Sequence, residues 1–203
     1  MRVIGLTGNS GAGKSLVASI LKASGLPVID ADAVYHELLQ KGGACTDELA
    51  KAFGKKILDK NGCVDRRALS LAVFGKPETE ALLHTLNNIT HKYVMSEIEK
   101  MLQAYKLDGA RYAVLDAPLL FEANAHLLCD LVIGVVAKEQ TRMARIVKRD
   151  GLSEEAAKRR LAAQKSDAFY RERCDHILKN DTDEAALRED LFALLQGIGV
   201  DLI

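Results

Sequence analysis

The sequence has no excess of charge of either sign, no long apolar stretch and no closely spaced cysteines. Its 203 residues include 28 Lys and Arg and 28 Asp and Glu, so the formal net charge is zero. Bulk electrostatics therefore gives no reason to expect nucleic acid or an anionic membrane as a partner, and any cationic site has to be local. We expect neither a signal peptide nor a membrane span, which favours a cytoplasmic location.

The four cysteines are far apart and form no C-x-x-C pair; they are Cys45, Cys63, Cys129 and Cys174. Zinc ligands usually come in pairs at short spacing, so a zinc site built from distant Cys and His side chains is the weaker interpretation. The sequence favours reduced thiols. The five histidines also lack metal-ligand spacing, and each is expected to be structural.

Five short apolar runs alternate with longer helical patterns. The composition, 48% hydrophobic and 28% charged, is ordinary for one compact protein. The runs are 3–7, 27–29, 112–115, 131–136 and, more weakly, 176–178. Their connections are long enough for helical crossovers, so we predict an α/β fold with a doubly wound sheet of about five parallel strands and helices on both faces. Ligands of such sheets bind at the carboxyl ends of the strands.

Two regions interrupt this alternation. From about residue 36 to residue 110 the strand signals are absent and apolar residues recur at helical spacing, which predicts a helical insertion. The second region covers residues 140–164 and breaks at 150–153, where Ser153 is typical of a helix start, so it predicts a helical hairpin. We expect a core over 1–35, 111–139 and 174–203, a helical subdomain over 36–110 and a lid over 140–173.

Residues 8–15 read G-N-S-G-A-G-K-S, which matches the pattern of a phosphate-binding loop. An apolar run precedes it and a helical pattern follows, so a chance glycine-rich turn is the less favoured alternative. Glycines let backbone N–H groups point inward, and the helix N-terminus adds partial positive charge. Lys14 can reach the outer phosphates and the Ser15 hydroxyl can bind Mg²⁺. The expected nucleotide-binding residues of the loop are Gly8, Gly11, Ala12, Gly13, Lys14, Ser15 and Leu16.

Carboxylates follow the second and third apolar runs. Asp30 and Asp32 come directly after the second run, at the sheet edge where ligands gather. A carboxylate there can accept the proton of an attacking hydroxyl or hold Mg²⁺, although either aspartate can instead cap the following helix. Asp116 ends the third run, where P-loop enzymes hold magnesium; the alternative is a cap on the turn that Pro118 opens.

Positive charge concentrates in the predicted lid. Residues 140–173 contain ten Lys or Arg and five Asp or Glu, a local net charge of +5. Arg145 and Arg149 are four residues apart on one helix face, so both guanidinium groups can converge on a triphosphate. A solvated amphipathic hairpin is the alternative. Aromatic residues are scarce there, which argues against a groove for single-stranded nucleic acid.

These motifs together resemble the dephospho-coenzyme A kinase family over nearly the whole chain. The similar blocks are I-G-L-T-G-N-S-G-A-G-K-S at 4–15, V-I-D-A-D at 28–32, the F-G to R-A-L segment over 53–69, P-L-L-F-E at 118–122 and the segment 145–164. The resemblance implies ATP-dependent phosphorylation of the ribose 3′-hydroxyl of dephospho-CoA, the last step of coenzyme A synthesis, with Mg²⁺. Asp32 matches the family's proposed catalytic base, and Lys14 and Arg145 are the other expected catalytic residues.

Two segments depart from the family pattern. The chain has L-N-N-I-T-H-K at 86–92 where L-E-x-I-x-H-P is usual, so an acid and a proline are missing near His91. The phosphate loop has Asn9-Ser10 where Gly-Ile is usual, a change that leaves every requirement of the loop in place.

Two other functions are compatible with part of the sequence. A kinase of the same fold acting on another small hydroxyl, such as that of a nucleotide or a sugar acid, would share the sheet and the loop. A GTPase-type switch would need N-K-x-D after a buried strand and a D-x-x-G turn. The segment 179–181 has the needed residues in the wrong order, and 116–119 lacks the glycine.

Overall fold

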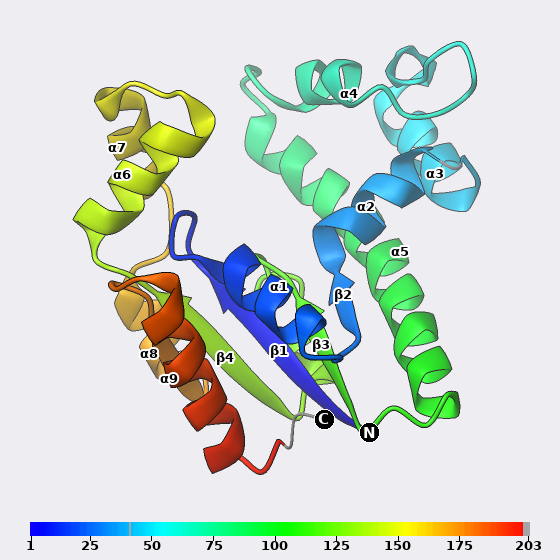
Figure 1. Ribbon diagram of the computed structural model, residues 1–203. Coiled ribbons are helices and arrows are strands. Elements are labelled where there is room, and N and C mark those ends of the chain that lie inside the picture. The colour runs from blue at the N-terminus through cyan, green and yellow to red at the C-terminus, as the bar shows by residue number, and fades with distance from the viewer. Residues whose placement is uncertain (41, 201–203) are drawn as a thin grey trace. The chain divides into compact units, whose positions relative to one another are not determined.

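The computed structural model describes residues 1–40 and 42–200 (Figure 1). The predicted ranges 36–110 and 174–203 therefore include residues 41 and 201–203, which lie outside the described residues. The chain forms two compact units: Met1–Ile29 with Tyr105–Ile203, and Asp30–Ala104.

A five-stranded parallel sheet organises the first unit, as the sequence predicts. The strand order is β2-β3-β1-β4-β5. The strands are β1 (Arg2–Gly8), β2 (Val28–Asp30), β3 (Tyr112–Asp116), β4 (Leu131–Val136) and β5 (His176–Lys179). Strand β1 pairs with β3 and with β4, so that Leu6 lies beside both Asp116 and Ile133. The loop that follows β1 is therefore delivered to the middle of the carboxyl edge of the sheet.

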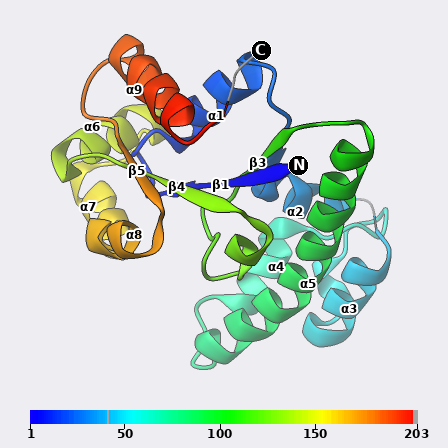
Figure 2. The same ribbon diagram turned by 90° about the horizontal axis from the view of Figure 1, so that it is seen from below.

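Helices cover both faces of this sheet. Helices α1 (Lys14–Ala23) and α9 (Glu184–Gly197) lie on one face, and α8 (Asp167–Arg173) lies on the other (Figure 2). Apolar residues recur at helical spacing in such helices, so they form one stripe that faces the sheet. The inward residues of α1 and α9 form one buried cluster with the sheet, including Val17, Ile20 and Leu21 of α1 and Leu187, Leu191 and Leu195 of α9.

Helices α6 (Glu139–Asp150) and α7 (Glu154–Ala162) form the predicted hairpin. Gly151 ends α6 with a left-handed φ of 64°, and the Ser153 hydroxyl accepts a hydrogen bond from Ala156 N at the start of α7. Ile146, Ala157 and Leu161 are the buried core between the two helices. The break that the sequence predicts at 150–153 is thus confirmed.

The second unit is helical and has its own core, as the sequence predicts for the insertion. Its elements are α2 (Ala31–Gln40), α3 (Ala44–Phe53), the 3-10 helix η1 (Lys55–Ile57), α4 (Arg66–Val73) and α5 (Thr79–Leu107), whose last turn belongs to the first unit. Leu39, Leu49, Ile57, Leu69 and Val73 are buried together in this core. In the part of the chain that the structure describes, no helix is long and apolar enough to cross a membrane.

Candidate active site

The phosphate loop joins β1 to α1 and needs glycine at two positions for space and for backbone geometry. Gly11 has a φ of 79° and Gly13 a φ of 99°, both in the left-handed region that side chains disfavour. A Cβ at Gly13 would stand 2.0 Å from Asn180 Nδ2, and a Cβ at Gly11 would stand 2.7 Å from the Arg142 carbonyl oxygen. The glycines therefore let the loop curl while other chain segments press directly against it.

Helix α1 begins at Lys14, directly behind the last glycine of the loop. The N–H groups of Leu16 and Val17 donate to the Gly13 carbonyl at 3.0 Å and 3.1 Å. The amides that precede Leu16 at this end have no carbonyl one turn earlier in the helix to donate to, and the helix dipole adds positive potential there. This end of α1 is consequently suited to an anion, as the motif predicts.

Lys14 and Asp116 form a partly buried ion pair across the carboxyl edge of the sheet. Lys14 Nζ contacts Asp116 Oδ1, and the two side chains are 14% and 7% exposed. Asp116 ends β3 beside β1, which explains why its carboxylate reaches the loop. The predicted placement of this aspartate is found, while its role as a metal ligand stays a prediction.

The Ser15 hydroxyl and the Asp116 carboxylate have the right chemistry for Mg²⁺. This ion prefers oxygen ligands and commonly takes one or two from the protein, with phosphates and water completing its shell. Within residues 1–40 and 42–200 there is no group of three or more His, Cys, Asp or Glu side chains able to hold a metal ion. The chemistry of the two oxygen donors therefore fits an ion whose shell is completed by phosphates and water.

Arg145 of α6 contacts both the loop and Asn180. Its Nη1 donates to the Gly11 carbonyl at 3.3 Å and to the Asn180 carbonyl at 3.0 Å, and its Nη2 donates to Asn180 Oδ1 at 3.2 Å. Asn180 is 2% exposed, and its Nδ2 donates to the Ala12 carbonyl at 2.8 Å. Sequence reasoning did not find Asn180, although its position directly after the fifth strand was an available signal.

Arg149, one turn further along α6, also contacts the loop. It binds a side chain of the loop, whereas Arg145 binds the main chain. Its Nη2 donates to Ser10 Oγ at 3.3 Å, and its Nε lies 2.7 Å from Asp150 Oδ1. Arg160 of α7 lies 2.7 Å from Asp150 Oδ2. The hydrogen bond from Arg149 is the main cause that lowers the pKa of Asp150, and the charges of both arginines add to it. The predicted pair thus contacts different atoms of the loop.

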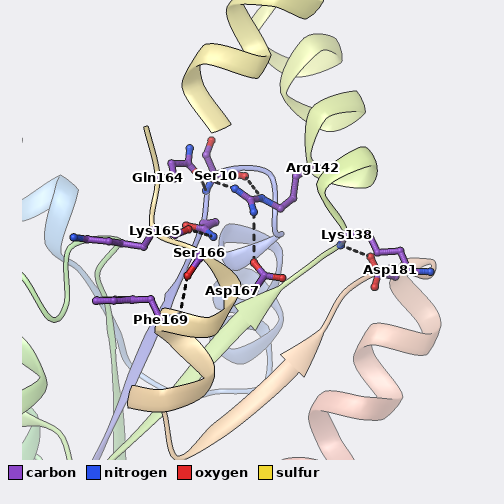
Figure 3. A network of polar contacts seen from close by, with 10 residues as sticks. Ser10, Lys138, Arg142, Gln164, Lys165, Ser166, Asp167, Phe169 and Asp181 are labelled. Carbon is purple, nitrogen blue, oxygen red and sulfur yellow. Dashed lines mark hydrogen bonds and ion pairs between the residues drawn. The ribbon is translucent and has the colours of Figure 1, made fainter. Parts of the chain in front are cut away.

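A third arginine of the hairpin, Arg142, is buried against the loop. The sequence shows it only as one of the ten basic residues of 140–173. It is 6% exposed. Figure 3 shows its side chain reaching from α6 toward Ser10, Gln164 and Asp167. The phosphate loop is therefore contacted by arginines from three successive turns of one helix.

Asp30 is the last residue of β2 and Asp32 lies in the first turn of α2, and both belong to the second unit. Asp30 Oδ1 accepts hydrogen bonds from the N–H groups of Asp32 at 2.9 Å and Ala33 at 3.1 Å, so Asp30 caps the helix. The capping alternative is thus confirmed for Asp30. Asp32 is exposed in the first turn of α2. Its role as a base stays a prediction.

The departure from the family pattern near His91 is accommodated inside one continuous helix. Lys92 stands where a proline is usual, and α5 runs through it without a break. Glu48 Oε2 accepts hydrogen bonds from Tyr93 OH at 2.7 Å and from Lys92 Nζ at 3.1 Å. These two bonds, with that of Tyr93 first, lower the pKa of the Glu48 carboxyl.

Comparison with known proteins agrees with this geometry. The family model of dephospho-CoA kinase matches residues 2–186. The chain is 38% identical over 180 residues to a dephospho-CoA kinase of Corynebacterium diphtheriae, which covers 89% of this chain and 88% of that protein. A solved structure from Thermus thermophilus is similar with a TM-score of 0.79, 32% identity and 97% of each chain covered. Dephospho-CoA kinase from Campylobacter jejuni is similar with a TM-score of 0.64, 27% identity and 97% of each chain covered. The predicted family and fold are thus confirmed.

Proposed function

Because the chain belongs to the dephospho-CoA kinase family, we propose that it transfers the γ-phosphoryl group of ATP to the ribose 3′-hydroxyl of dephospho-CoA, giving coenzyme A and ADP. The observation that carries the proposal is the phosphate loop at the N-terminus of α1, with Lys14 at its base and Arg145 against its main chain. This is an assembly for binding and neutralising a chain of phosphates.

In this reaction the first task of the protein is to hold the phosphates. The amides at the start of α1 and the Lys14 ammonium would bind the phosphate oxygens, and Arg145 would neutralise the charge that develops on them. Ser15 and Asp116 would hold Mg²⁺, which supplies further charge neutralisation on the phosphates when it is bound. Lys14 would then exchange part of its contact with Asp116 for the nucleotide.

The second task is the transfer itself. The 3′-oxygen forms a bond to the γ-phosphorus while the bond from that phosphorus to the β,γ-bridging oxygen breaks, and ADP leaves. Asp32 would accept the proton of the 3′-hydroxyl. Because the transition state of phosphoryl transfer is loose, alignment and electrostatics supply most of the catalysis. The α6–α7 hairpin would exclude water, which otherwise competes as the acceptor.

A coupled ADP-release assay with a panel of acceptors tests this function. We expect ATP turnover with dephospho-CoA, and a product with one added phosphate on the ribose 3′-oxygen by ³¹P NMR. The panel should include nucleoside monophosphates, gluconate and shikimate. Faster turnover with one of these would establish the alternative kinase, whereas slow hydrolysis that no acceptor accelerates would indicate a nucleotide switch. The Lys14→Ala variant, purified in parallel, excludes a contaminating kinase.

A further inference from the structure

The main chain of Ser10 is held on both sides by two side chains that also bind each other. Ser10 N donates to Gln164 Oε1 at 3.1 Å, and the Ser10 carbonyl accepts from Arg142 Nε at 3.2 Å. Arg142 Nη2 donates to the same Gln164 oxygen at 2.9 Å. The three residues therefore close a ring of hydrogen bonds at the front of the phosphate loop (Figure 3).

The arginine of this ring is committed to the protein. Its guanidinium is buried, and its Nη1 lies 3.5 Å from Asp167 Oδ1 at the start of α8. A buried charge needs such a compensating partner, and removing it to reach a ligand would cost much of that compensation. Arg142 thus differs from Arg149, whose side chain is 54% exposed.

Helix α6 and the connection after α7 also contact the residues on either side of Ser10. Asn9 Nδ2 donates to the Lys165 carbonyl at 2.9 Å. The Arg142 carbonyl occupies the space where Gly11 would carry a Cβ. Gln164 and Lys165 lie in the short connection between α7 and α8, inside the predicted lid and directly after the α6–α7 hairpin. Residues 9–11 of the loop are consequently held by Arg142 of the hairpin and by these two residues of the connection that follows the hairpin.

We propose that Gln164 and Arg142 are positioning residues that fix the two peptide planes on either side of the Ser10 Cα before nucleotide binds. A loop with glycines on both sides of Ser10 has many accessible conformations, and an anion site works best when its donors are aligned in advance. The Ser10 N–H belongs to the Asn9–Ser10 peptide and the Ser10 carbonyl to the Ser10–Gly11 peptide, so holding both fixes where the following amides point. Because the Ser10 N–H is bound to Gln164, the phosphates would be bound by amides further along the loop.

This inference rests on the proposed function, and the variants Gln164→Met and Gln164→Glu test it. Methionine keeps the length of the side chain but lacks a good acceptor, whereas glutamate keeps the oxygen that the ring uses. For Gln164→Met we expect kcat/KM to fall about tenfold to hundredfold, because a lost anchor misplaces groups that must align. The KM for ATP should rise while the KM for dephospho-CoA stays unchanged, and Gln164→Glu should recover most of the loss.

Amide hydrogen exchange without nucleotide gives a readout that does not depend on activity. The Ser10 amide should exchange faster in Gln164→Met than in wild type, while amides of β1 and β4 stay protected. The affinity for a non-hydrolysable ATP analogue should fall in parallel. The matched control is Gln196→Met, at an exposed glutamine of α9, which should change neither. If wild type does not phosphorylate dephospho-CoA, the proposed function fails, but these two measurements still decide the role of Gln164.

Unchanged Ser10 exchange and unchanged ATP affinity in Gln164→Met would overturn the proposal. So would a loss of protection throughout the sheet, because Gln164 would then be needed for folding in general. A failure of Gln164→Glu to recover ATP affinity would also contradict it. Should Gln164→Met not fold, Arg142→Lys provides the second variant: it keeps the charge but cannot contact Ser10, Gln164 and Asp167 together, so the Ser10 amide should again exchange faster.

Discussion

Asn180 holds the Arg145 guanidinium with two oxygens, its carbonyl at 3.0 Å from Nη1 and its Oδ1 at 3.2 Å from Nη2. The same asparagine donates to the Ala12 carbonyl at 2.8 Å and fills the space in front of Gly13. One buried amide therefore connects Arg145 of the hairpin to the phosphate loop. Arginine has no acceptor of its own, so the position of its planar fork is set by the oxygens around it.

The first prediction is that Asn180 and Arg145 act as a unit. Asn180→Ala should lower kcat/KM by about tenfold or more, because Arg145 loses an oxygen that orients it. Combined with Arg145→Ala, it should add little further loss, since two residues that act through one contact are not additive. Steady-state kinetics of the four proteins in this cycle measures the coupling. Fully additive losses would show that the two side chains work separately, and Asn61→Ala, at an exposed asparagine, is the control.

The second prediction concerns the cation at the base of the loop. Lys14→Ala removes an ammonium positioned for the outer phosphates, so kcat/KM should fall by at least about two orders of magnitude, comparable to the loss of one strong electrostatic donor. The matched control is Lys22→Ala, at an exposed lysine of the same helix, which should keep wild-type kinetics. Circular dichroism should show an unchanged fold. Wild-type turnover by Lys14→Ala would mean that the loop is not the catalytic phosphate site.

The third prediction ranks the two arginines of the lid. Arg145→Ala should slow phosphoryl transfer more than Arg149→Ala, because Arg149 is largely exposed and already paired with Asp150. Lysine should restore only part of the activity at position 145, since it lacks the planar fork. Arg159→Ala, at an exposed residue of α7, serves as the control.

Protease accessibility provides an independent measurement of the same lid. A hairpin that closes over nucleotide should be cleaved more slowly when an ATP analogue is added, and less so in the double variant of Arg145 and Arg149. If the double variant has the kinetics and the cleavage rates of wild type, the basic cluster is only a solvated surface.

Local patterns predicted the sheet and the α6–α7 hairpin well because their signals lie within a few residues. Strand β4 is found over the predicted range 131–136, and Ser153 caps α7 where the sequence places a helix start. Periodicity and capping report on short stretches of backbone, so these features needed no knowledge of distant contacts. The helices α8 and α9 were not predicted.

Several contacts that build the site connect residues more than a hundred positions apart, and sequence spacing does not reveal them. Arg142 reaches Ser10 over 132 positions and Asn180 reaches Ala12 over 168. The hairpin charge was visible in the sequence, but burial of Arg142 depends on how α6 packs against the loop. Gln164 was noticed only within a family-like segment, since a single glutamine carries no signal for binding a main-chain amide.

The fourth prediction concerns acid stability in the second unit. The folded-state pKa of Glu48 is lowered below its ordinary value of 4.5, first by the hydrogen bond from Tyr93 and then by Lys92. A lowered carboxyl pKa stabilises the fold above that ordinary value, and the stabilisation is lost as the pH falls through the lowered pKa. Tyr93→Phe should therefore unfold at a lower temperature than wild type at pH 7, and the difference should shrink below about pH 4.5.

Thermal unfolding over a pH series measures this difference. Tyr105→Phe is the matched control, because its effect on the unfolding midpoint should not depend on pH in this range. A difference between wild type and Tyr93→Phe that stays constant from pH 7 into the acid range would contradict a role for the Glu48 carboxylate.

The fifth prediction assigns the base. Asp32→Asn keeps the size of the side chain but removes the proton acceptor, so ATP affinity should change little while the chemical step slows by roughly two to four orders of magnitude. Part of this loss can reflect poorer orientation of the 3′-hydroxyl, because the transition state is loose. Single-turnover rates across pH separate the two roles: a base gives wild type a limb of falling rate at low pH, and that limb should be absent in Asp32→Asn.

Asp30→Asn is the matched control for this experiment, since it makes the same chemical change two residues away. Asparagine keeps an oxygen that can accept from the N–H groups of Asp32 and Ala33, so the cap of α2 should persist and the rate should stay near that of wild type. If Asp32→Asn instead retains its single-turnover rate with dephospho-CoA while Asp30→Asn loses it, the base has been assigned to the wrong carboxylate. If both variants retain it, Asp116 becomes the next candidate, because its carboxylate already lies against Lys14 at the phosphate loop.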